Sequence, residues 1–249
     1  MEGRLIEVLE ILTIEVGISL EKSLMLNIDI YSDVICPWCW IGKRRLETGL
    51  ALAGRAATVR WHPFELNPDM PTAGVERHEY RIKKFGSIQR SIELDRHVAE
   101  AGRGVGLEFN FEKMLHTPNT FDAHRIIWFA GEHGVQDSVV EALFQAYFVD
   151  GRNLSDRATL ATIASEGGLD QREVNDLLSG EWGKTEVKAG LLKATRLGIR
   201  GVPFFVFNSL YAMSGAQAPE TFLAAIKRSI PAGAGDSCTF DPTSGKQES

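Results

Sequence analysis

Two cysteines separated by two residues, Cys36 and Cys39, are the side chains of this sequence best suited to chemistry. Such a pair can close a disulfide and be reduced again, so disulfide exchange with another molecule is the chemistry to expect. Zinc binding is the alternative, because a Cys-x-x-Cys can supply half of the four ligands of a zinc site. The third cysteine, Cys238, lies in a polar tail, and there is no second Cys-x-x-Cys and no closely spaced histidine pair. Dithiol chemistry is therefore favoured over zinc.

The surrounding pattern places both cysteines at the start of a helix. Residues 26–31 alternate apolar and polar side chains as a half-buried strand does, and residues 43–53 carry leucines suited to an amphipathic helix. Unpaired N–H groups at a helix start favour an anion, so Cys36 should ionise more readily than a free thiol and act as the nucleophile. Cys39 is expected to be more shielded and to resolve the mixed disulfide. Pro37 suits a first helical turn, where its missing N–H would be unpaired anyway.

A second feature, far along the chain, is the apolar, aromatic and β-rich run of residues 198–207, which contains Gly201-Val202-Pro203. This run has the composition of a strand, and residues 211–215 can form its hairpin partner. Proline is tolerated at the first residue of a strand, so this run taken alone is an ordinary loop-to-strand boundary.

Together, the strand, the Cys-x-x-Cys, the helix and the Val-Pro before a later strand resemble the thioredoxin superfamily. The resemblance is closer to the FrnE branch of the DsbA-like oxidoreductases. It covers about residues 26–230 and rests on these phrases: Ser32-Asp-Val-Ile-Cys-Pro-Trp-Cys-Trp-Ile-Gly-Lys43, Pro63-Phe-Glu-Leu-Asn-Pro68, Asn119-Thr120, Ala123-His-Arg125, Gly201-Val-Pro-Phe-Phe205 and Ser214-Gly-Ala-Gln217.

What the resemblance implies is an α/β protein, a thioredoxin-like fold with a large all-helical insertion, whose activity is thiol–disulfide exchange. It implies a cis-proline at Pro203 beside the cysteines, and substrate contacts from Pro37, Trp38, Val202 and Pro203. The best-known DsbA proteins have histidine where Trp38 stands. Without that cation the helix terminus must supply most of the stabilisation of the thiolate, typically under ~1 kcal/mol and at best about 2 kcal/mol, which lowers the thiol pKa by roughly one unit or a little more. This argues against a strongly oxidising potential.

The helical periodicity of residues 74–196 interrupts two strand-containing segments, residues 25–73 and 197–231. Neither segment has enough strands for a sheet of its own, so we expect them to form one thioredoxin-like domain around a helical insertion. Residues 1–24 are expected to be an N-terminal extension, and residues 232–249 a disordered tail.

Composition narrows the location and the partners. The net charge of -6 argues against a nucleic-acid-binding surface. Three cysteines are too few for a secreted disulfide framework, and no stretch approaches the ~18 apolar residues of a membrane helix. Residues 1–24 lack the pattern of a signal peptide, so a cytoplasmic protein is expected. The basic run 43–45 is expected to be a solvated helix face, or else to attract a glutathione carboxylate.

No metal or organic cofactor is required for this chemistry. The expected partners are protein or small-molecule thiols and disulfides, with glutathione as a candidate redox partner and a homodimer as a candidate assembly. Two other interpretations stay open. One is a glutathione-dependent enzyme resembling kappa-class transferases or 2-hydroxychromene-2-carboxylate isomerases, which typically carry serine where Cys36 stands. The other is a holdase-like binding protein.

His62 and His124 are expected to be packing residues.

Overall fold

The computed structural model describes residues 25–230 of the chain. The expected N-terminal extension at residues 1–24, the expected tail and Cys238 lie outside the described residues.

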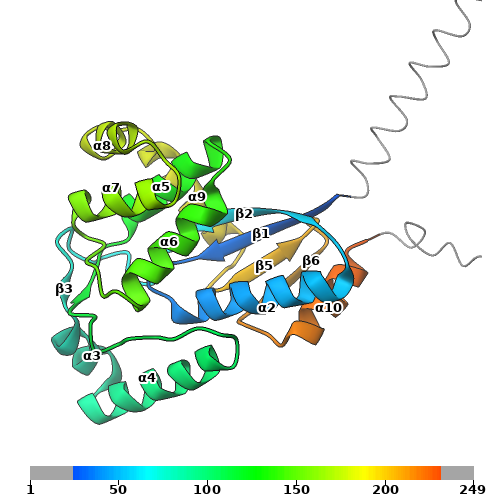
Figure 1. Cartoon of the computed structure of the whole chain (residues 1–249), viewed down its shortest axis with the longest axis horizontal. Coiled ribbons are helices and arrows are strands. Elements are labelled where there is room, and N and C mark those ends of the chain that lie inside the picture. The colour runs from blue at the N-terminus through cyan, green and yellow to red at the C-terminus, as the bar shows by residue number, and fades with distance from the viewer. Residues whose placement is uncertain (1–24, 231–249) are drawn as a thin grey trace, which may run out of the picture.

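A four-stranded mixed sheet is the centre of the fold (Figure 1). Its strands are β1 (Leu26–Ser32), β2 (Ala57–Pro63), β5 (Phe204–Phe207) and β6 (Tyr211–Ser214), in the order β2-β1-β5-β6. β1 runs parallel to β2 and antiparallel to β5, and β6 is antiparallel to β5. β1 thus has a neighbour on both sides, which brings the chain just after Ser32 close to the chain just before Phe204.

Two helices, α2 (Pro37–Ala53) and α10 (Pro219–Arg228), pack together against one face of this sheet (Figure 1). Their close approach depends on Gly49, because a Cβ there would lie 2.7 Å from the Cβ of Phe222. The ring of Phe222 meets the ring of Phe205 on β5 edge to face, and the two ring centroids are 4.8 Å apart. The helix that begins at the cysteines is therefore held to the sheet in part through α10.

The segment between β2 and β5 is mostly helical. Its elements are β3 (Val75–Glu76), α3 (Arg77–Phe85), α4 (Ile88–Arg103), β4 (His116–Thr117), α5 (Phe121–Glu132), α6 (Gln136–Phe148), α7 (Arg157–Glu166), α8 (Gln171–Ser179) and α9 (Lys184–Arg196). The insertion expected to be all-helical thus also contains a two-stranded β3–β4 ribbon. Each strand of the ribbon is only two residues long, which is too short to produce an alternating pattern in the sequence.

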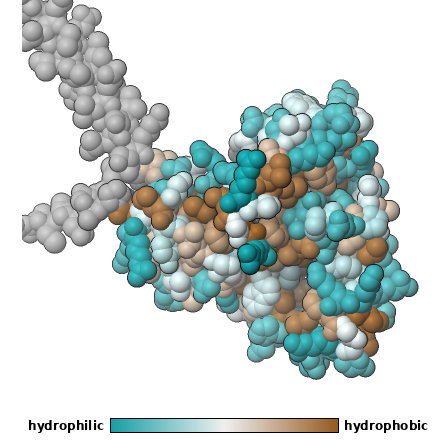
Figure 2. Space-filling model, turned by 180° about the vertical axis from the view of Figure 1, so that it is seen from behind, coloured by the Kyte–Doolittle hydropathy of each residue, from teal (hydrophilic) through white to brown (hydrophobic). Residues whose placement is uncertain are grey.

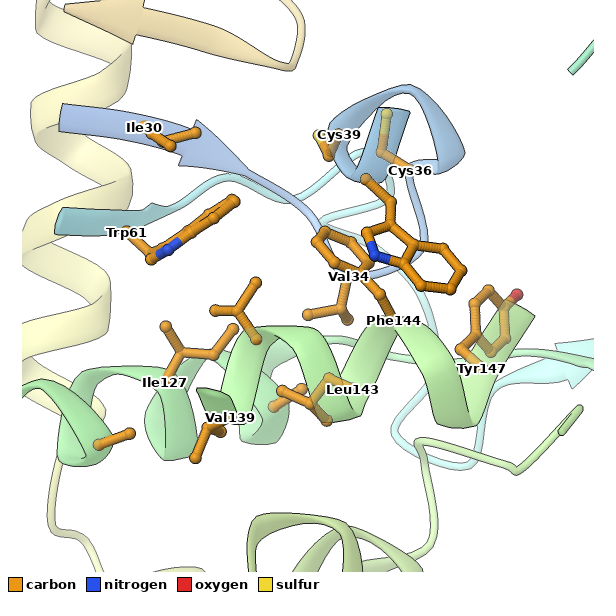
Figure 3. Close-up of a cluster of buried hydrophobic side chains, with 14 of the residues drawn as sticks. Ile30, Val34, Cys36, Cys39, Trp61, Ile127, Val139, Leu143, Phe144 and Tyr147 are labelled. Carbon is orange, nitrogen blue, oxygen red and sulfur yellow. The ribbon is translucent and has the colours of Figure 1, made fainter. Parts of the chain in front are cut away.

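The insertion and the sheet share one hydrophobic core. Figure 3 shows side chains of α6 and of β2 facing each other across it. The ring of Phe144 on α6 meets the ring of Trp61 on β2 edge to face, with the ring centroids 6.3 Å apart. It also stacks on the ring of Trp40 on α2, with a centroid distance of 5.9 Å. On the face away from α2, apolar surface is interrupted by polar and charged groups (Figure 2).

Candidate active site

The two cysteines lie where β1 passes into α2. After Ser32 the chain makes a tight turn, in which the N–H of Cys36 donates to the carbonyl oxygen of Asp33 at 2.9 Å. Cys36 is the N-cap residue of α2, and Pro37 occupies the first helical position. The N–H of Cys39 donates to the carbonyl oxygen of Cys36 at 3.0 Å. Both cysteines are free thiols, and they approach each other to 3.4 Å.

The surroundings of the two thiols differ. Cys36 borders a cavity of about 330 Å³, which we call the Cys36 cavity and which Pro37, Trp38 and Val202 also line. Cys39 is fully buried on the core side (Figure 3). Burial raises the pKa of the Cys39 thiol well above its usual value, and the neighbouring Cys36 adds to this effect. Cys39 is therefore a neutral thiol near pH 7 in the reduced protein.

The loop before β5 meets the start of α2. The thiol of Cys36 donates to the carbonyl oxygen of Val202 at 3.6 Å, and the peptide bond between Val202 and Pro203 is cis. Gly42 of α2 allows this approach, because a Cβ there would lie 3.1 Å from both Cγ of Pro203 and Cζ of Phe205. The absence of a side chain at Gly42, in the second turn of α2, thus allows close packing against the proline ring.

A buried carboxylate anchors the turn that carries the cysteines. Asp33 is fully buried, and its Oδ2 accepts the N–H of Leu66 at 2.7 Å, in the loop that follows β2. Its Oδ1 lies 3.7 Å from Nε2 of His124 on α5. Since Nε2 of His124 is also 3.0 Å from the carbonyl oxygen of Phe64, which can only accept, this nitrogen carries the proton. Burial raises the pKa of nearby Glu65.

Charged side chains hold α2 against α6. Lys43 is buried and pairs with Glu47, Asp137 and Glu141, the last two on α6. Burial lowers the pKa of Lys43, but these carboxylates outweigh it and leave the pKa raised. Glu141 also accepts the indole N–H of Trp40 at 3.0 Å. The prediction of a solvated basic face at residues 43–45 is therefore wrong for Lys43, because α6 supplies carboxylates that desolvate and pair it.

The far wall of the Cys36 cavity comes from α3 and α4. Arg77, Tyr80, Arg81 and Lys84 of α3 line it, with Asp95 of α4. Trp38 also lines the cavity, and its ring centroid lies 5.7 Å from that of His97 on α4. The insertion thus forms one side of the space in front of Cys36.

Residues 27–227 match the family of DSBA-like thioredoxin domains. This chain belongs to that family. The DsbA-like protein is 30% identical over 201 residues to YwbO, an uncharacterized protein of Bacillus subtilis, which covers 80% of this chain and 95% of YwbO. Thiol–disulfide oxidoreductase is the general class of activity that the family supports.

Solved structures share the fold. A probable DsbA oxidoreductase from Streptomyces coelicolor, SCO1869, is 31% identical with a TM-score of 0.76, over 82% of this chain and 89% of that one. The cytosolic disulfide reductase DsbM from Pseudomonas aeruginosa, in a structure with GSH, matches at 18% identity and a TM-score of 0.57, over 81% of this chain and 98% of DsbM. The likeness to DsbM concerns the fold alone. The expected α/β thioredoxin-like fold is confirmed.

The structure of this DsbA-like protein brings together all six residues that the sequence analysis expects to be catalytic or to contact substrate. Cys36 and Cys39 lie at the start of α2, and Pro37, Trp38 and Val202 line the Cys36 cavity. Pro203 packs behind them on Gly42. His62, by contrast, lies away from the cysteines, stacked on Tyr31 and bonded to Asp29 at 2.6 Å.

Sequence reasoning missed the polar residues that the insertion and the turn after β1 contribute. Asp33 was part of the quoted motif without a role, and the cavity-lining Arg77, Arg81 and Lys84 were not considered. The three cations are spaced four and three residues apart, directly after Glu76, the N-cap of α3, and such spacing places side chains on one face of a helix. This spacing was the available signal for a cationic helix face.

Within residues 25–230, no group of three or more His, Cys, Asp and Glu side chains is placed to hold a metal ion. None of the helices in the same range has the length and apolar character needed to span a bilayer.

Proposed function

We propose that this protein is a thiol–disulfide oxidoreductase that works through the Cys36-Pro-Trp-Cys39 dithiol. The observation that carries the proposal is the difference between the two thiols. Cys36 borders a cavity at the start of a helix, whereas Cys39 is sealed in the core with a raised pKa. A nucleophile must meet a substrate disulfide, and a resolving thiol needs only to reach the nucleophile, 3.4 Å away.

The reaction proceeds in two exchanges. The Cys36 thiolate attacks one sulfur of a substrate disulfide, forming a mixed disulfide and releasing the other sulfur as a thiolate. Cys39 then loses its proton and attacks the sulfur of Cys36, which closes the Cys36–Cys39 disulfide and releases the second substrate thiolate. Two electrons pass to the substrate. Val202 and Pro203 dock the substrate chain, and Pro37 and Trp38 contact it at the cavity rim.

Protein or small-molecule thiols and disulfides are the partners, and these two exchanges use no metal or organic cofactor. Glutathione is the candidate redox partner, which is supported by the shared fold of DsbM, a protein with a structure containing GSH. A place in the FrnE branch, a cytoplasmic location and a homodimer complete the proposal. DsbM is described as cytosolic, which supports the location.

Cysteine replacement tests the proposal. Purified, reduced Cys36→Ser should leave insulin disulfides intact, and Cys39→Ser should accumulate a mixed disulfide with insulin or glutathione that mass spectrometry detects. The Cys36–Cys39 equilibrium with glutathione then separates a reductant from an oxidant, because about 30 mV corresponds to 1.4 kcal/mol for this couple.

Other outcomes point to other functions. Full activity of Cys36→Ser would reject the dithiol mechanism and favour a glutathione-dependent isomerase or transferase, since those enzymes typically carry serine at this position. Suppression of client aggregation by a variant without either cysteine, and no exchange by the unaltered protein, would instead show a holdase.

A further inference from the structure

The wall that α3 contributes to the Cys36 cavity is strongly cationic. Arg77, Arg81 and Lys84 line the cavity from one face of α3, and Asp95 is the single acidic residue among the described residues that line it. Three positive charges therefore meet one negative charge in a space that also contains the sulfur of Cys36. An excess of positive charge beside a nucleophile is a site for an anion.

The two guanidinium groups are held in place before any ligand arrives. Asp95 binds both of them, with Oδ2 at 2.8 Å from Nη2 of Arg77 and Oδ1 at 2.6 Å from Nη2 of Arg81. Arg81 also donates from Nε to the hydroxyl of Ser91 at 2.6 Å. In residues 25–230, Nη1 of each arginine has no hydrogen-bond partner, which leaves donors for a further acceptor.

The charge balance within this wall favours an additional anion. Burial lowers the pKa of Arg81, and the neighbouring charge of Arg77 adds to this, while Asp95 opposes it. A second carboxylate next to the two arginines would relieve the repulsion between them. Bidentate binding of a carboxylate by guanidinium groups is a strong and specific contact.

Lys84 supplies a third, more accessible cation. Its ammonium group donates to the hydroxyl of Tyr80 at 2.6 Å and to Oδ1 of Asn67 at 3.1 Å. An ammonium has three donors, so one is left for a ligand. The next residue back along the chain, Lys83, lines a different hollow, between the loop after β2 and α3, and makes no wall of the Cys36 cavity.

We propose that this cationic wall binds the carboxylate of a low-molecular-weight anionic disulfide and so selects that class of substrate for Cys36. The proposal rests on the exchange activity proposed above. The cavity of about 330 Å³ lies within the ~300–1,000 Å³ of small-ligand sites, a size that suits a short peptide disulfide better than a folded protein loop. The carboxylate on the arginines and the disulfide beside Cys36 would then occupy opposite walls of one cavity.

The electron balance is that of the two exchanges described above, in which two electrons pass from the dithiol to the substrate disulfide. Cys36 forms a bond to one substrate sulfur, and the substrate S–S bond breaks and releases an anionic thiolate. Cys39 then displaces the second thiolate, and its proton goes to solvent. The substrate is the oxidant, so a single turnover of the reduced protein needs no other reagent.

Three small disulfides of different charge test the selection: oxidised glutathione, which is anionic, uncharged 2-hydroxyethyl disulfide, and cationic cystamine. The rate of oxidation of the reduced protein should be highest with oxidised glutathione and lowest with cystamine, and the difference should shrink as salt is added. Lys84→Gln should lower the rate with oxidised glutathione roughly three- to fivefold, because exposed charges contribute little. Arg81→Gln should lower it about tenfold or more. With 2-hydroxyethyl disulfide, which has no carboxylate, the loss in both variants should be much smaller than with oxidised glutathione.

Lys83→Gln is the matched control and should leave all three rates unchanged. Equal rates with the three disulfides, or losses in Lys84→Gln that are the same for every disulfide, would overturn the selection while leaving the exchange activity in place. A preference for acidic segments of a protein disulfide over oxidised glutathione would overturn the small-molecule class. No reaction with any disulfide would instead refute the proposed function. If Arg81→Gln does not fold, the rates of Lys84→Gln and the salt dependence still test whether the cavity selects anionic disulfides.

Discussion

Cys36 and Val202, which are 166 residues apart in the sequence, are joined by a hydrogen bond in which the thiol donates to the carbonyl oxygen at 3.6 Å. Only the protonated thiol can make this bond. In the proposed reaction Cys36 attacks as a thiolate, so the carbonyl of Val202 would lose its donor and become free to accept an N–H from a bound substrate. The loop before β5 would thus exchange an internal partner for a substrate partner at the step in which the nucleophile is formed.

Replacement of Pro203 should therefore affect substrate binding more than sulfur chemistry. The proline ring packs on Gly42 and fixes the chain that carries the Val202 carbonyl. We expect Pro203→Ala to slow mixed-disulfide formation by about tenfold through looser positioning. The Cys36–Cys39 disulfide should still form with a chemical oxidant, because both sulfurs lie on α2. Stopped-flow kinetics and thiol counting separate the two effects, and an equal loss of both would contradict this role.

Gly42→Ala should disturb the same contact from the side of α2. A Cβ at position 42 would lie 3.1 Å from both Pro203 and Phe205, so one of them must shift. Such overpacking costs about 1–3 kcal/mol of the free energy of unfolding, part of which is offset by the higher helix propensity of alanine. We expect slower exchange in this variant and a lower midpoint in urea unfolding.

Gly201→Ala is the matched control for that experiment. It introduces the same methyl group two residues before Pro203, at a position where no atom lies within 4 Å of the new Cβ. Unchanged exchange and stability are expected. If Gly201→Ala slowed exchange as much as Gly42→Ala, the loop backbone rather than its packing on α2 would set the rate.

The parts of this structure that could be predicted from the sequence depend on local signals. The alternation before Cys36, the proline at the first helical position and the β-rich run after Pro203 each fix an element without reference to the rest of the chain. These elements carry all six predicted site residues. The resemblance to a family then supplied their arrangement in space, which no periodicity contains.

The parts that could not be predicted depend on how distant elements pack. From the sequence alone Lys43 is expected to be exposed, but in the fold α6 places Asp137 and Glu141 against it. Arg77 and Arg81 line the same cavity as Cys36 only because α3 packs on α4 and α4 contacts α2. Burial and charge pairing of this kind are properties of the assembled tertiary structure, so a single sequence does not reveal them.

Alkylation should report the different surroundings of the two thiols. Because burial raises the pKa of Cys39, its labelling by iodoacetamide in the reduced folded protein should be slow at neutral pH and increase only at alkaline pH. Cys36, at the edge of the cavity, should be labelled first. Peptide mass spectrometry at several pH values measures both rates. In urea the difference should vanish, and equal labelling in the folded protein would show that Cys39 is not shielded.

Glu141→Gln should destabilise the fold and change its response to acid. Lys43 and Arg44 hold the pKa of Glu141 below its usual value against the opposing effect of burial. A carboxyl whose pKa is depressed on folding stabilises the protein fully above its unfolded pKa of about 4.3, and this stabilisation is lost as the pH falls through the lower folded value. We expect the variant to lose about 1–2 kcal/mol at pH 7, because buried Lys43 keeps two other carboxylates. The difference from the unaltered protein should shrink below pH 4.

Glu93→Gln provides the comparison for this last experiment. Glu93 pairs with Arg90 on α4, and both side chains are more than half exposed, at 59% and 60%. Solvent screens such a pair, so its loss should change the free energy of unfolding by less than about 0.5 kcal/mol at any pH. Urea unfolding of both variants between pH 3 and pH 7 measures the two contributions. A pH-independent loss in Glu141→Gln would show that the side chain acts through its contact with Trp40 rather than through its charge.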